Sequence, residues 1–434
     1  MSTVEQAGSV PIEDAPVDTP ESSLVPAKKA ERIGSLDLIR GIAVMGILVA
    51  NIVAFGQPFQ AYMYPEAFLT DHGPASDWLL VAQFVLIDGK MRALFTLLFG
   101  AGLYLFMERA WARGASRRLQ MRRLFFLMLF GMIHFYLIWL GDILFYYAVI
   151  GFVIVGCLKW SAKAQLWTGL IGYIFGALLY ATMLSVPYVV SETSIGESEE
   201  MAPMRVDLDR GKAEALAESS RESALIQSGD YFGYVTLRAT EHWYEPLVNV
   251  FFFGLESLPL MLLGVALYRM GFFSGSFAPR KMRLWGWLGL TIGAAWHLAL
   301  ALWAKGDGYT YYGMLAIFVG WSPIPRLMMA LGIAALLVEY SPQWTGWLAQ
   351  RVSAAGRAAF TNYLGTSIVM LFVFHGWALG LFGELSRPML YVVTALTCAL
   401  MLAWSKPWLE RYRYGPLEWL WRCLTYGKMF PLKR

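Results

Sequence analysis

At 434 residues the chain is long enough for two or three soluble domains, but 57% of its residues are hydrophobic and only 15% are charged. This composition excludes an ordinary soluble protein. The formal net charge is only +4, and the basic residues are not gathered in one stripe, so no nucleic-acid partner is expected.

The three cysteines stand singly without a CxxC spacing. The absence of such a spacing argues against a disulfide framework or a zinc site. We therefore expect no metal and no covalently bound cofactor.

The first 33 residues are polar, rich in Pro, Ser, Glu and Ala, and lack the features of a cleaved signal peptide. We interpret residues 1–33 as a disordered cytoplasmic tail. Beyond them, apolar runs of about 18 to 25 residues are long enough to cross a hydrocarbon core. They predict an all-α, polytopic membrane bundle of ten helices. The expected spans are 36–55, 92–108, 124–140, 143–158, 166–188, 247–269, 284–304, 313–338, 358–376 and 389–405.

The distribution of Lys and Arg between the connecting segments predicts the orientation. Segment 109–123 contains six Arg, the tail from Lys406 contains seven Lys or Arg, and loop 56–77 contains none. The basic segments therefore belong on the cytoplasmic side, together with both termini. We divide the chain into a membrane half at 34–190 (spans one to five), an insertion at 191–245, a second membrane half at 246–405 and an interfacial tail at 406–434.

Two segments interrupt the regular alternation of spans and short loops. The polar break Asp88-Gly89-Lys90 predicts a short interfacial helix at 78–87 before the second span. Residues 191–245 contain twelve Asp or Glu against five Lys or Arg. We expect this insertion to be mostly helical and to cover the outer mouth of the bundle.

The first span carries polar residues that need an explanation. Asp37 and Arg40 are three residues apart on one helix face at the cytoplasmic boundary, where they can form an ion pair. Alternatively, Arg40 binds anionic groups of a donor. Asn51 lies about 16 Å further along the helix, deep in the bilayer. It either bonds to another helix or orients a substrate carbonyl.

His134 falls near the middle of the third span, where ionisable groups are costly and often functional. It is a candidate general base, or else a structural histidine. Asp142 follows eight residues later, about 12 Å away on a continuous helix. A direct pair between the two is therefore not expected, and Asp142 is the N-cap candidate of the fourth span or a cavity residue.

Lys90 and Arg92 flank the break before the second span, on the side where basic residues are rare. They either reach lipid phosphates or line a cavity for an anionic group. His72 lies in a Pro- and Gly-containing loop with Asp71 beside it, and loops of this kind often carry function. Alternatively, His72 is simply a solvated histidine in a loop.

Five stretches carry a resemblance to a known family. They are LDLIRGIAVMGILVAN (36–51), GKMRALFTLLFGAG (89–102), HFYLIWLGDILFYYAVIG (134–151), FTNYL (360–364) and YGPLEWLWRCLTYG (414–427). Together they resemble the YeiB family, bacterial inner-membrane proteins with domain of unknown function 418. The start of the chain also resembles a wider superfamily of transmembrane acyltransferases, which includes the lysosomal enzyme that acetylates the terminal glucosamine of heparan sulfate with cytosolic acetyl-CoA.

The resemblance implies a location in the bacterial inner membrane and an acyl-CoA donor, as co-substrate, entering from the cytoplasm. In the lysosomal enzyme a catalytic histidine follows an asparagine at the place of Asn51, and His72 is the corresponding candidate here. The FTNYL motif adds Asn362 to the candidate substrate-binding residues.

We therefore expect an acyltransferase acting on a small-molecule, glycan or lipid acceptor from outside, with His134 or His72 as base and Asn51 and Asp142 assisting. The candidate binding residues are Asp37, Arg40, Lys90, Arg92 and Asn362. The alternatives are a transporter or flippase and a non-catalytic partner protein. Membrane lipids are expected partners, and a second copy of the chain is left open.

Overall fold

A computed structural model describes residues 34–70 and 73–434. The expected tail at 1–33 and the candidate His72 lie outside the described residues. Within them the regular elements are helices, and the only β pairing is a single bridge between Tyr412 and Lys433. The helices are α1 (Gly34–Gly56), α2 (Pro74–Leu86), α3 (Lys90–Trp111), α4 (Arg117–Ile133), α5 (Leu144–Cys157), α6 (Ala162–Glu192), α7 (Ala202–Ser228), α8 (Tyr231–Thr240), α9 (Glu245–Arg269), α10 (Pro279–Gly306), α11 (Tyr311–Leu315), α12 (Pro323–Tyr340), α13 (Trp347–Arg357), α14 (Ala359–Phe374), α15 (Arg387–Arg411) and α16 (Pro416–Tyr426).

Seven helical segments of the described chain are long and apolar enough to cross a membrane, and α13 with α14 forms an eighth candidate bent by 86°. The seven are α1, α4 with its continuation, α6, α9, α10, α12 with its continuation, and α15. The chain is therefore a helical membrane protein. Helix α5 has only 14 residues, about 21 Å at 1.5 Å per residue. The count of ten crossings and the sides of the termini stay predictions.

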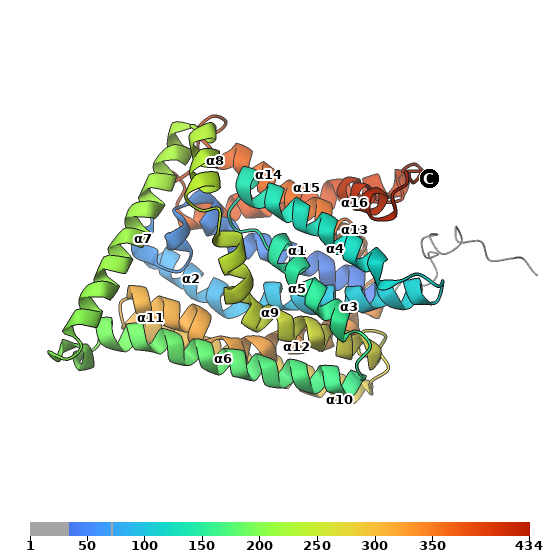
Figure 1. Ribbon diagram of the computed structural model, residues 1–434, viewed down its shortest axis with the longest axis horizontal. Coiled ribbons are helices and arrows are strands. Elements are labelled where there is room, and N and C mark those ends of the chain that lie inside the picture. The colour runs from blue at the N-terminus through green and yellow to red at the C-terminus, as the bar shows by residue number, and fades with distance from the viewer. Residues whose placement is uncertain (1–33, 71–72) are drawn as a thin grey trace, which may run out of the picture.

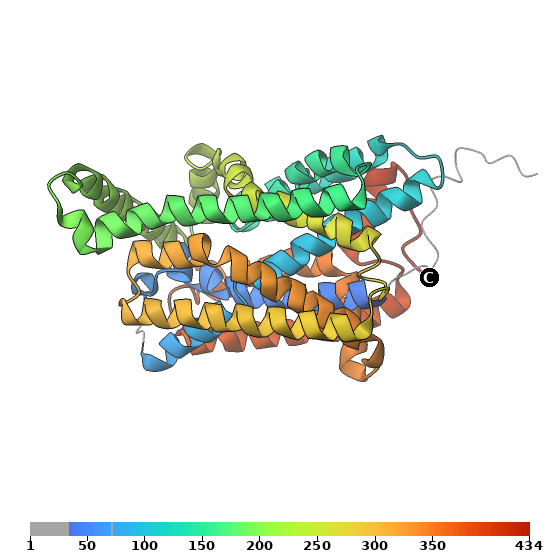
Figure 2. The same ribbon diagram turned by 90° about the horizontal axis from the view of Figure 1, so that it is seen from below.

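The bundle has two distinct ends. Most helices run roughly along one direction, α7 lies across one end, and the C-terminus lies at the other (Figure 1). In the view from below, the long α6 extends along one side of the bundle (Figure 2). We call the end covered by α7 and α8 the cap end. The opposite end holds the start of α4 and α16, which are joined by a hydrogen bond from Trp421 Nε1 to the Arg123 carbonyl, and we call it the basic end.

Helix α1 forms the centre of the bundle, with most of its residues buried. Near the basic end it packs against α13 at backbone contact distance. A Cβ on Gly41 would lie 2.1 Å from the Val352 carbonyl oxygen, and one on Gly356 would lie 1.8 Å from the Asp37 carbonyl oxygen. Only glycine allows the two backbones to approach this closely.

The chain breaks at three points, two of which lie within spans that were predicted to be continuous helices. The expected span 313–338 is interrupted, because α11 continues as the π-helical segment η7 (Ala316–Trp321) and α12 begins at Pro323, which cannot donate a backbone hydrogen bond. The expected span 124–140 ends in the π-helical turn η5 (His134–Ile138), after which Trp139 is extended. Before α3, Gly89 adopts a φ of +72°, which confirms the predicted break.

Candidate functional site

His134 and Asp142 form a buried pair at the end of η5. Asp142 Oδ1 lies 2.8 Å from His134 Nδ1, and the two side chains are 0% and 1% exposed. The expectation that they would not meet was wrong, because it assumed a continuous helix. The chain leaves the helix after Ile138 and turns back, which brings Asp142 beside the imidazole.

Asp142 also holds the start of α5. Its Oδ2 accepts a hydrogen bond of 2.7 Å from the Phe145 amide in the first turn, although the N-cap residue of α5 is Ile143, one position after the predicted Asp142. When the carboxylate is ionised it only accepts hydrogen bonds, and His134 Nδ1 then donates to it. His134 Nε2 is then the acceptor nitrogen, and it has no hydrogen-bond partner among the described residues.

Tyr363 from α14 supports this turn. Its ring meets the His134 imidazole edge to face, with 5.3 Å between the centroids. Its hydroxyl accepts a hydrogen bond of 3.2 Å from the Ile143 amide. Trp139 stacks on Phe55 of α1 at 3.9 Å. Tyr363 of α14 and Phe55 of α1 therefore both pack against the break between α4 and α5.

A cavity of about 490 Å³ lies under α7 and α8 and reaches into the bundle. Asn51 and Asp142 both line it, so the structure brings these two candidates together. A small void of about 10 Å³ continues from Asn51 towards Trp139 and Tyr363. We call the larger space the cap-end cavity.

Arg92, another predicted site residue, lines the same cavity within a charged cluster that sequence reasoning missed. Arg92 lies 2.6 Å from Glu256 Oε2, and Arg326 Nη1 lies 3.0 Å from both oxygens of that carboxylate. Glu256 stands alone in the apolar run of α9, and Arg326 in that of α12. A lone charge inside an apolar helix was the available signal.

Lys90 does not line this cavity. Its ammonium is fully buried and donates to the Phe84 carbonyl at the end of α2. The lipid-facing alternative for Lys90 therefore does not fit its position, whereas its neighbour Arg92 faces the cavity.

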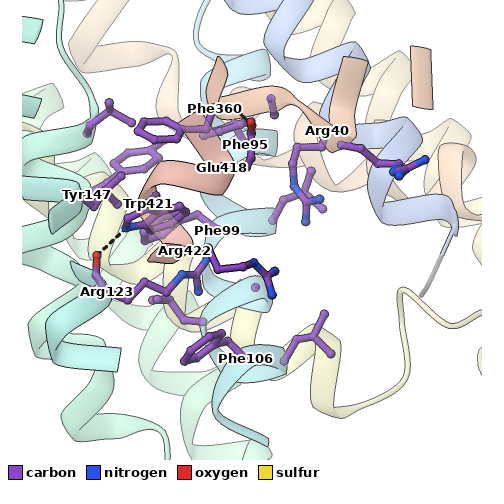
Figure 3. A pocket seen from close by; sticks show the side chains of 18 of the residues that line it. Arg40, Phe95, Phe99, Phe106, Arg123, Tyr147, Phe360, Glu418, Trp421 and Arg422 are labelled. Atoms are coloured by element: carbon purple, nitrogen blue, oxygen red, sulfur yellow. Dashed lines mark hydrogen bonds between the residues drawn. The ribbon is translucent and has the colours of Figure 1, made fainter. Parts of the chain in front are cut away.

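A second cavity, of about 340 Å³, lies at the basic end. We call it the basic cavity, and Figure 3 shows Arg40, Arg123 and Arg422 around it among aromatic side chains. The six arginines that line it are Arg40, Arg109, Arg113, Arg123, Arg357 and Arg422. The Arg123 guanidinium lies over the Trp421 ring, 4.3 Å from its centroid.

Arg40 is one of the candidate binding residues, and its ion pair with Asp37 is present at 3.0 Å. Because Arg40 also lines the basic cavity, the two readings of this pair are compatible.

The C-terminal motif GPLEW builds one wall of the basic cavity. Glu418 accepts hydrogen bonds from the amides of Phe360 and Thr361 at 2.8 and 3.0 Å, and from the Thr361 hydroxyl. It thus satisfies free N–H groups at the start of α14, where the chain bends. Sequence reasoning treated this tail only as an interfacial helix and missed the role of Glu418.

The Asn362 side chain forms hydrogen bonds that hold neighbouring helices together. Its Nδ2 donates to the Ala355 carbonyl at 3.0 Å and to Ser405 Oγ at 3.1 Å, and its Oδ1 accepts from Trp404 at 2.9 Å. The amide thus joins α13, α14 and α15. The predicted substrate-binding role of Asn362 gains no support from this geometry and stays a prediction.

The two cavities approach each other at the start of α5. Leu144 and Tyr147 line the basic cavity, whereas Ile143 and Tyr146 line the cap-end cavity. Tyr363, which touches His134, also lines the basic cavity. Among residues 34–70 and 73–434 there is no group of three or more His, Cys, Asp or Glu that could hold a metal ion.

Fold and site together define a helical membrane protein with polar cavities at both ends of its bundle. The chain belongs to the YeiB family. It is 32% identical to the uncharacterized protein YxaH of Bacillus subtilis over 95% of this chain and 99% of the relative. It is 30% identical to the uncharacterized protein YeiB of Escherichia coli over 91% of this chain and 96% of that relative.

A family model described as a protein of unknown function (DUF418) matches residues 267–428. No solved structure matches the chain.

Proposed function

We propose that this protein is a bacterial inner-membrane acyltransferase that uses an acyl-CoA donor. The proposal includes the predicted topology of ten membrane spans with both termini in the cytoplasm. In this topology the basic end of the bundle faces the cytoplasm. The six arginines of the basic cavity support it, since guanidinium groups suit the phosphates of CoA. The aromatic rings between them suit the adenine and the pantetheine arm.

The acceptor, a hydroxyl or amine on a small molecule, glycan or lipid, would enter the cap-end cavity from the other side. Its oxygen or nitrogen attacks the thioester carbonyl, the new C–O or C–N bond forms, and the C–S bond breaks. His134 Nε2 takes the proton of the acceptor and delivers it to the CoA thiolate. Asp142 keeps the imidazole in the tautomer that this step needs, and Asn51 donates towards the developing oxyanion.

The observation that carries the proposal is the position of the pair of His134 and Asp142. Asp142 lines the cap-end cavity, and Tyr363, in contact with His134, lines the basic cavity. The two residues that contact the imidazole thus reach one cavity each, whereas His134 itself is fully buried between them and lines neither cavity.

The test uses the purified full-length protein. CoA thioesters of several chain lengths should raise its melting temperature, and incubation of a labelled acyl-CoA with bacterial membrane extract should give a labelled product and free CoA. His134→Gln should abolish transfer while CoA still raises the melting temperature. Arg422→Gln should weaken the apparent affinity for CoA, measured through the melting temperature, about tenfold. This is the value of one charge-assisted hydrogen bond. The absence of any CoA response across chain lengths would contradict the proposal.

A carrier is the second candidate, because the two cavities lie towards opposite ends and residues at the start of α5 line both of them. A carrier would need this layer to open alternately. Cysteines placed at Tyr147 and Tyr146 would then change their reactivity towards a water-soluble thiol reagent when ligand is added. An enzyme with fixed cavities would leave both reactivities unchanged.

A further inference from the structure

Two guanidinium groups share one carboxylate at the floor of the cap-end cavity. Glu256 is shared by Arg92 and Arg326, and Asp88 lies beside the buried Lys90 and Arg387. Arg92, Arg326 and Glu256 line the cavity together with Asp88 and Asp142, whereas Lys90 and Arg387 are fully buried and do not line it. Two guanidinium groups on one carboxylate leave a positive charge that is costly in a region of low dielectric constant, so an anion beside Arg92 and Arg326 would be stabilised.

The backbone adds to this excess. Helix α3 begins at Lys90, with Arg92 in its first turn and no acidic residue there. The N-terminal end of a helix carries a partial positive charge and favours anions. Two cations at this position oppose the usual preference, which makes sense if an anionic group is bound in front of them.

The Arg92 guanidinium is the one that such a group can reach most directly. The Arg92 side chain is 22% exposed, and it lines the cavity. Arg326 lines the same space, and its Nε has no hydrogen-bond partner among the described residues. The Arg326 side chain packs against Gly89, where a Cβ would lie 2.2 Å from Arg326 Nε, and this contact fixes the guanidinium in the cavity wall.

The rim of the cavity has the opposite character. Arg238 lies 2.8 Å from Glu222 and 3.2 Å from Glu245, and His242 lies 2.9 Å from Glu218. Three carboxylates thus face one arginine and one histidine, and all five residues line the cavity. A molecule with several negative charges would be repelled here, whereas an ammonium group would be attracted.

We propose that the cap-end cavity binds a small zwitterionic molecule or headgroup, with its phosphate or carboxylate at Arg92 and Arg326 and its ammonium towards the acidic rim. Calling this molecule the acyl acceptor rests on the proposed function, but its binding does not. A free metabolite and a phospholipid headgroup share this chemistry, so the two sources must be separated by experiment.

The test measures binding to the purified full-length protein in detergent by calorimetry and thermal shift. The probes are glycerophosphoethanolamine, glycerol 3-phosphate and ethanolamine. Glycerophosphoethanolamine should bind most tightly, glycerol 3-phosphate more weakly because of the acidic rim, and ethanolamine least. If ethanolamine binds as well as glycerophosphoethanolamine, the anionic subsite is refuted.

Substitutions at this site should change the affinity for glycerophosphoethanolamine in opposite directions. Arg92→Gln should weaken glycerophosphoethanolamine binding at least tenfold, and Arg92→Lys should retain part of it. Glu256→Gln removes the carboxylate that competes for the two guanidinium groups, so affinity should rise and the melting temperature should depend more strongly on the probe. Arg210→Gln, an exposed ion-paired arginine on α7, is the matched control and should bind like wild type.

If Arg92→Gln fails to fold, Glu256→Gln decides alone, and an unchanged or lower affinity would overturn the proposal. Reconstitution into bilayers with and without phosphatidylethanolamine separates the sources. Competition of that lipid with the soluble probe indicates a headgroup site, and lack of competition indicates a free metabolite. Binding without any acyl transfer would overturn the proposed function while leaving this site in place.

Discussion

Asp142 contacts the His134 imidazole through Oδ1, at 2.8 Å, while its other oxygen, Oδ2, accepts a hydrogen bond from the first turn of α5. One carboxylate therefore fixes both a histidine tautomer and the start of a helix. This relationship exists only because α4 loosens into a π-helical turn and then ends. π-helical turns are rare and occur often at functional sites.

Asp142→Asn should separate the two roles of this carboxylate. The amide can still cap α5, so the fold should lose only about 1 to 3 kcal/mol, the cost of a weakened buried hydrogen bond. The imidazole loses its charged partner, and acyl transfer should fall about 10²- to 10⁴-fold. Unfolding in detergent and the transfer assay check the two effects, and unchanged transfer would remove His134 from the mechanism.

Gly356→Ala should destabilise the protein by about 1 to 3 kcal/mol through overpacking, since its Cβ would lie 1.8 Å from the Asp37 carbonyl oxygen of α1. Gly365→Ala is the matched control, because nothing lies within 4 Å of its Cβ. In the interior of α14 it should be neutral or stabilising by about 0.5 to 1 kcal/mol. Thermal unfolding of both proteins checks this contact, and equal melting temperatures would contradict it.

Glu418→Ala removes the acceptor at the start of α14. It should cost about 1 to 2 kcal/mol, the usual value of a lost helix cap, and it should loosen the wall of the basic cavity. Hydrogen exchange should increase at Phe360 and Thr361, whose amides Glu418 binds. Glu410→Ala, an exposed acid on α15, should change stability by less than about 0.5 kcal/mol; a similar loss in both would show that the effect is unspecific.

Glu222 should make the contact between α7 and α8 depend on pH. Burial raises the pKa of its carboxyl above the usual value of 4.5, and Arg238 opposes this shift only in part. The folded state then binds the proton more tightly than the unfolded state. The resulting stability is complete below pH about 4.5 and is lost as the pH rises through the raised pKa.

Hydrogen exchange of α7 and α8, corrected for intrinsic rates, measures this effect between pH 7.5 and 5. Protection should increase on acidification in wild type, and the increase should be smaller in Glu222→Gln. Asp207→Asn, at an exposed position on α7, should behave like wild type. The same pH response in Glu222→Gln and in wild type would assign the effect to another group.

Some of the candidate site could be read from the sequence because single residues break an apolar pattern. His134, Arg92 and Asn51 stand out in this way, and two of them line the cap-end cavity. Glu256 and Arg326 carry the same signal and were missed, because neither lies in a distinctive motif. The contact between His134 and Asp142 could not be predicted, since helical periodicity gives no information once the helix ends.

The sequence by itself determined that this is an all-α membrane protein, because long apolar runs leave the backbone no other way to satisfy its hydrogen bonds in lipid. It also determined which polar residues need a partner. Only the tertiary structure decided who those partners are: Glu256 between Arg92 and Arg326, Asp142 beside His134, and Glu418 on α14. These pairings depend on breaks, bends and close glycine contacts between distant segments, and such long-range geometry has no local periodic signal.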